Sequence, residues 1–259
     1  MGHVRLKTFP NGRSWRQVVE LLDEGAPVAE IAAASARAAD GALSKAASDP
    51  AFRRVVWLLT QLPAAARDPN YVGALNSLGL HTDVAPSLMR LLAGFERAVD
   101  IEARRSGGRT DLGEMAQLAA AASLTRGIAP DLPSMFETTA TDVQSAIGKL
   151  GSRDRFARLS RNFFADLLQR SLEYYLSRAY AGHVGPGEAF ASIDDQAEFR
   201  RALEVHCHDA ALIVERYAAE WFSKINFEGG ITPAKAEDFA QTAFRKIRAE
   251  LSHRSRTDG

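Results

Sequence analysis

The sequence predicts an all-α protein, a bundle of several helices that can be divided into two helical subdomains. Nearly every segment long enough to show a period repeats its apolar residues every three or four positions, as an amphipathic helix does. No segment alternates apolar and polar residues like a half-buried strand, and β-branched residues are sparse. Alanine, the strongest helix former, is abundant throughout the 259 residues. We therefore expect helices separated by short breaks, with the longest amphipathic helices in the C-terminal half.

Residues 1–130 are predicted to form an N-terminal helical subdomain. Ser14 is placed to cap its first helix and Gly25 to end it. Pro27 begins an alanine-rich helical stretch, and Pro50 stands at the first position of the next helix, where proline is favoured. Further helices are expected at 71–79, 83–105 and 112–125.

The helical pattern weakens over residues 131–151, which contain prolines and a run of threonines and are expected to form a connector with one short helix. Residues 152–259 are predicted to form the C-terminal helical subdomain. Glycine-rich breaks at 182–187 and 229–230 separate its helices. Its three long helices are expected at about 152–181, 194–226 and 232–251.

The composition excludes several classes of protein. The chain has 32 basic and 32 acidic residues, 46% hydrophobic residues and one cysteine, so neither a disordered chain nor an intrachain disulfide is expected. Its zero net charge gives no overall field that would attract nucleic acid or anionic lipid. Acids precede bases by four positions at Asp154 and Arg158 and at Asp166 and Arg170, a spacing that indicates an exposed helix face. With no secretory signal and no long apolar run, we expect a cytoplasmic protein without membrane contact. The alanine and arginine bias indicates a GC-rich bacterial genome.

The densest group of residues that could perform chemistry is Glu204 to Asp209. His208 and Asp209 resemble the dyad of HD-type phosphohydrolases, all-helical enzymes that hold a divalent metal with His…His-Asp…Asp. The resemblance implies a metal site made of His183, His208, Asp209 and Asp238. The favoured interpretation is structural, with His206 facing the core and the dyad in solvent, and it predicts neither a metal nor a cofactor.

Residues 15–47 look like the beginning of a helix-turn-helix, in which Arg37, Ser44 and Lys45 could contact DNA. A structural helical hairpin would have the same pattern, and the chain lacks a basic footprint, so nucleic-acid binding is not favoured. Two basic runs, at 153–161 and at 245–256, could contact RNA or a phosphate group, although solvated helix faces explain them better.

Three aromatic residues, Trp221, Phe222 and Phe227, precede the Gly229-Gly230 turn. They are expected either to anchor the last helix internally, which is favoured, or to form an interaction hot spot. Phosphate-loop and nucleophile motifs are absent from the sequence.

The predicted function is therefore a non-enzymatic interaction or scaffold subunit of a larger bacterial assembly, such as a defence or secretion system. It would bind protein partners or a second copy of itself. A DNA-binding regulator and a metal-dependent phosphohydrolase are the alternatives.

Overall fold

The computed structural model describes residues 13–38, 48–134, 137–180, 185 and 190–257. These residues form α-helices and one short 3-10 helix, with no strand among them, and the predicted all-α bundle is confirmed. The elements are α1 (Arg13–Asp23), α2 (Val28–Ala38), α4 (Pro50–Arg67), α5 (Tyr71–Ser77), α6 (Leu88–Arg105), α7 (Asp111–Ile128), η1 (Ala129–Asp131), α8 (Ala140–Lys149), α9 (Arg153–Tyr180), α10 (Ile193–Ala210), α11 (Leu212–Phe227) and α12 (Pro233–Thr257).

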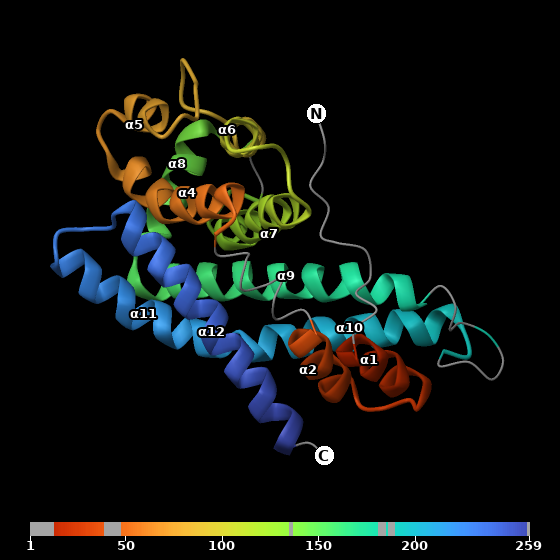
Figure 1. The fold of residues 1–259 in the computed structure, drawn as a ribbon. Coiled ribbons are helices and arrows are strands. Elements are labelled where there is room, and N and C mark those ends of the chain that lie inside the picture. Colours follow the sequence, from red (N-terminus) through yellow and green to blue (C-terminus); the bar gives the residue numbers. More distant parts are fainter. Residues whose placement is uncertain (1–12, 39–47, 135–136, 181–184, 186–189, 258–259) are drawn as a thin grey trace.

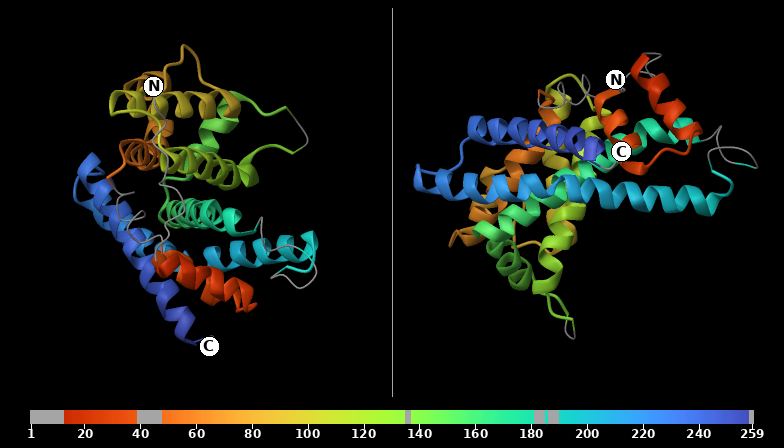
Figure 2. Two further views of the ribbon diagram at one scale, coloured as in Figure 1. Left: turned by 45° about the vertical axis from the view of Figure 1, so that its right-hand side comes forward. Right: turned by 90° about the horizontal axis from the view of Figure 1, so that it is seen from below.

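Helix α9 runs through the middle of the molecule (Figure 1). Helices α4 to α8 lie on one side of it and α10 and α11 on the other, while α12 crosses α9 and contacts both α4 and α11 (Figure 2). The first two helices pack with this second group, since α2 contacts α12, α10 and α9. The predicted segment 1–130 thus contributes helices to both sides of α9, while its division from 131–151 and 152–259 stays a prediction.

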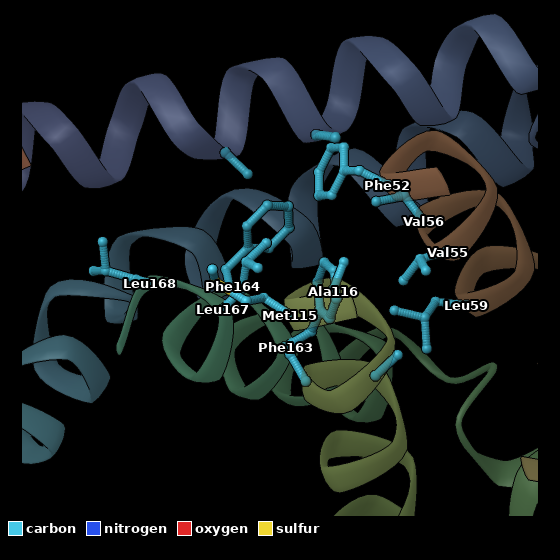
Figure 3. Packing of buried hydrophobic residues seen from close by; sticks show 14 of the residues in the cluster. Phe52, Val55, Val56, Leu59, Met115, Ala116, Phe163, Phe164, Leu167 and Leu168 are labelled. Carbon is cyan, nitrogen blue, oxygen red and sulfur yellow. The ribbon is translucent and has the colours of Figure 1, made fainter. Parts of the chain in front are cut away.

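Aromatic side chains fill the space between α4, α9 and α12 (Figure 3). The ring of Phe52 on α4 lies 6.3 Å from that of Phe163 and 5.4 Å from that of Phe244, centroid to centroid. Phe164 meets Phe244 edge-on at 5.3 Å. Burying several large rings against one another provides much of the hydrophobic free energy that holds the three helices together.

Local sequence signals set several helix ends where they were expected. The carboxylate of Asp49 accepts a hydrogen bond from the backbone N–H of Phe52 at 2.9 Å, and Pro50 occupies the first turn of α4. Gly25 adopts a φ of +64° between α1 and α2, a conformation that side chains with a Cβ resist. Within the part of the chain that the structure describes, none of the helices has the length and apolar content that a membrane crossing requires.

The helix predicted over 194–226 is two helices in the structure, because the chain bends at Ala211 between α10 and α11. Ala211 is fully buried and keeps nearly helical angles, with φ −77° and ψ −6°. The carbonyl of His208 belongs to the last turn of α10, where carbonyls lack a partner in their own helix. Arg161 on α9 supplies one, since its Nε donates to this oxygen at 3.3 Å. Arg161 on α9 thus provides a hydrogen bond to a carbonyl at the end of α10.

Candidate functional site

Polar side chains from α7, α9 and α10 meet around the buried carboxylate of Asp166. The His208 Nε2 atom lies 3.4 Å from Asp166 Oδ1. From α7, Arg126 Nη1 donates to both carboxylate oxygens at 3.3 and 3.4 Å, and Ser123 Oγ donates at 3.5 Å. The carboxylate therefore has partners on two neighbouring helices, as a buried charge requires.

The structure places the predicted metal ligands as follows. His208 is half-buried and faces Asp166, Asp209 is half-buried on the same helix, and Asp238 is exposed on α12. His183 lies outside the described residues. Among the residues that are described, no group of three or more His, Cys, Asp or Glu side chains could hold a metal ion. The described part of the proposed set therefore does not form a metal site by itself, and the set with His183 stays a prediction.

Cys207 lies between the two histidines in the sequence, but its side chain points into the core and is fully buried. Burial raises the pKa of its thiol, with smaller contributions from Glu173 and Glu204. Because the thiolate is the reactive form, a thiol held neutral in the core is unsuited to nucleophilic catalysis.

The helix pair suggested by residues 15–47 is present as α1 and α2. Six consecutive residues of α2, Ile31 to Ala36, are buried, and α2 packs on α12, α10 and α9. Arg37 is exposed in its last turn, while Ser44 and Lys45 lie outside the described residues. A recognition helix needs a free face to enter a DNA groove, and the described turns of α2 are largely covered.

A cavity of about 470 Å³ lies where the end of α2 meets α12. It brings together two basic features that are some two hundred positions apart in the sequence, Arg37 and the run that begins at Arg245. The described lining residues are Ala36, Arg37, Arg245, Arg248, Ala249 and Ser252.

The three aromatic residues of the α11 end are divided between the core and the surface. Phe222 stacks on Phe156 of α9 at 4.4 Å, and the ring of Trp221 lies 4.5 Å from that of Phe239 on α12. Phe227 is 93% exposed. Helical geometry explains the difference, because a residue five positions after Phe222 points about 140° away from it. Two of the three residues thus anchor the last helix internally.

A second cavity, of about 400 Å³, lies at the turn between α11 and α12, and its lining includes Asn226, which precedes Phe227 in the chain. Its wall includes apolar groups of α4 and of the turn, with Pro63, Ala64 and Ile231 among them. The turn between α11 and α12 therefore carries both an exposed aromatic ring and a hollow, although the ring is not among the residues that line the hollow. Sequence reasoning found the ring but not the hollow, since the hollow depends on the packing of α4 against the α11–α12 turn.

Comparison of the chain with protein-family models, with curated proteins and with solved structures found no match.

Proposed function

We propose that this protein is a non-enzymatic interaction subunit, and that the α11–α12 corner around Phe227 is its contact surface. The observation that supports this proposal is the 93% exposure of Phe227. A phenyl ring in water forgoes the hydrophobic free energy that burial would give, about 2 kcal/mol for a whole side chain. Polar residues close to Phe227 in the sequence, Lys224, Asn226 and Glu228, are exposed as well. An aromatic anchor with a polar rim is the usual anatomy of a protein–protein hot spot.

The corner is held in one conformation before any partner arrives. Gly229 and Gly230 turn the chain with φ values of +89° and +95°, and the Gly230 N–H donates to the carbonyl of Ile225 at 2.9 Å. The Lys235 Nζ atom donates to the carbonyl of Gly230 at 3.1 Å and so ties the turn to α12. A preorganised surface loses little conformational entropy on binding.

The occupant that this surface fits best is a second copy of the chain. A two-fold interface pairs the same patch on both subunits, so the patch must be complementary to itself. Here the exposed ring of Phe227 and a cavity of about 400 Å³ belong to the same α11–α12 corner. A cavity of about 150 Å³ already accepts a benzene molecule, so this one has room for a phenylalanine ring. Each subunit can offer its ring to the hollow of the other.

The test is the oligomeric state of purified protein, measured by analytical ultracentrifugation over a range of concentrations. We expect a dimer that Phe227→Ser converts to monomer. Met89→Ser is the matched control, because Met89 on α6 is also strongly exposed, at 76%, but lies away from the cavity. A monomeric wild-type protein, or a dimer that both substitutions weaken equally, would contradict the proposal.

In the cell, we place this subunit in the bacterial cytoplasm, within a larger assembly. The dimer would leave the surfaces away from this corner for further partners. When tagged and untagged chains are expressed together, purification through the tag should recover less untagged chain with Phe227→Ser than with the wild type. The substitution should not unfold the protein.

A further inference from the structure

Three arginines line the cavity between α2 and α12, and none of its described lining residues carries a carboxylate. Arg37 comes from the last turn of α2, and Arg245 and Arg248 come from one face of α12. Residues three apart on a helix are neighbours, and like charges at that spacing repel each other. The cavity thus concentrates positive charge in a chain whose formal net charge is zero.

Helix electrostatics explain only part of this arrangement. A cation in the last turn of a helix interacts favourably with the helix dipole, which accounts for Arg37. That interaction fades within one turn, so it concerns Arg37 alone. Arg245 and Arg248 reach the same hollow from α12. The Nη2 atom of Arg245 donates to Thr242 Oγ1 at 3.1 Å, which orients its guanidinium group.

We propose that this cavity binds the phosphate group of a small phosphorylated molecule. Guanidinium groups match phosphate oxygens with pairs of parallel hydrogen bonds, and arginine is the residue of choice for such sites. The Ser252 hydroxyl adds a further hydrogen-bonding group, while Ala36 and Ala249 contribute only small side chains to the lining. These small side chains leave room for the ligand between the charged ones.

The size of the cavity indicates a ligand larger than a bare phosphate ion. Its volume of about 470 Å³ falls within the range of pockets that hold small molecules, about 300–1,000 Å³. Nucleic acid fits this geometry less well, because it requires cations spread along a groove or stripe that follows many phosphates. A concave site with three clustered arginines suits one phosphate or a short chain of phosphates.

Isothermal titration calorimetry with inorganic pyrophosphate and with ATP tests the proposal, at a low ionic strength of about 50 mM that limits screening. We expect one molecule bound per chain. Tighter binding of ATP than of pyrophosphate would identify a nucleotide as the source of the phosphate, and equal binding would identify phosphate alone. The variant Arg245→Gln with Arg248→Gln should weaken binding roughly tenfold or more, because charge-assisted hydrogen bonds are lost.

The control removes two arginines elsewhere, Arg16→Gln with Arg216→Gln, so that both double variants have the same net charge. Arg16 on α1 and Arg216 on α11 are both exposed and lie outside the cavity lining. Equal loss of binding in the two double variants would show a general charge effect and overturn the proposal. So would the absence of binding by either probe, or tighter binding of a DNA duplex that depends equally on both arginine pairs. Arg37→Gln, which changes the cavity lining on α2, should also weaken the binding of pyrophosphate and ATP.

This site is independent of the proposed dimer. The cavity lies toward the far end of α12 from the Phe227 corner, about 18 Å along the helix axis, given 1.5 Å per residue. Phe227→Ser should therefore leave the affinity for pyrophosphate unchanged. A monomeric wild-type protein that still bound pyrophosphate would contradict the dimer and support the phosphate site.

Discussion

The imidazole of His208 lies 3.4 Å from the carboxylate of Asp166, and this contact joins α10 to the centre of α9. Arg126 completes the arrangement from α7. Asp166 on α9 thus links its own helix to α7 and to α10. The histidine of the His208-Asp209 dyad thus contacts a buried carboxylate in this arrangement and does not face solvent alone.

Replacing Asp166 with alanine should lower the free energy of unfolding by about 2 kcal/mol, because His208, Arg126 and Ser123 lose their shared acceptor. The value is below that of a fully buried pair, since the Arg126 side chain is 47% exposed. Urea denaturation measures it. Asp154→Ala is the control, because the Asp154 side chain is 80% exposed. Equal stability of the two variants would show that the cluster contributes nothing to folding.

The aromatic corner predicts opposite results for neighbouring rings. Phe156→Ala and Phe222→Ala should each cost about 3 kcal/mol or more of stability, because their stacked rings are buried. Phe227→Ala should change stability by less than about 0.5 kcal/mol, since its ring is in solvent in the isolated chain. These free energies are measured by denaturation at protein concentrations low enough to keep the chain monomeric. A large loss in Phe227→Ala would mean that the ring packs within its own subunit.

The helical fold could be predicted from the sequence because its signals are local. The apolar period of α12 and the Asp49-Pro50 start of α4 are properties of neighbouring residues. The bend at Ala211 could not be predicted in this way. Alanine pairs favour an unbroken helix, and the donor that satisfies the free carbonyl, Arg161, is some fifty positions away.

Arg161→Met should therefore affect the bend more than the rest of the fold. Arg161 donates to the carbonyl of His208 and, through Nη1, to Glu215 on α11 at 3.3 Å, so it bridges the two helices across Ala211. We expect a loss of about 1 kcal/mol in global stability, since these partly exposed bonds are weakened by solvent. Hydrogen exchange should rise selectively at the amides around residues 208–215. Uniform exchange changes across the chain would contradict this local role.

Stability should depend on pH through Asp131, at the end of η1. Hydrogen bonds from Arg155 and from Lys149, the latter at 2.8 Å, hold the pKa of this carboxyl below its usual value of 3.8. A lowered folded-state pKa means that the stabilisation is present above the unfolded-state pKa and is lost as pH falls through the folded-state value. The difference in unfolding free energy between wild type and Asp131→Asn should thus be constant near neutrality and shrink below about pH 4. In an Arg155→Gln background this pH dependence should be weaker, and an unchanged profile would assign it to other groups.

The candidate sites were predictable only in pieces. Arg37 and Arg245 each stand out in the sequence, but their meeting at one cavity follows from the packing of α2 on α12. The spacing of Asp166 and Arg170 indicates an exposed helix face, which is wrong for Asp166: its side chain is buried, and its partners in the structure are Arg126, His208 and Ser123. A helical period tells which residues share a face, but not which distant helix that face meets.

Cys207 offers a measurement of how often this interior opens. As the single cysteine of the chain it gives an unambiguous signal, and its buried thiol, whose pKa is raised by burial, should react with a thiol reagent only when the core is exposed. Labelling should therefore be slow in the native protein and fast in guanidinium. Because Cys207 immediately precedes His208, Asp166→Ala should speed labelling, whereas Asp154→Ala should not. Rapid labelling of the wild type at neutral pH would mean that α10 separates from α9 without global unfolding, and the contact between His208 and Asp166 would then be the first to open.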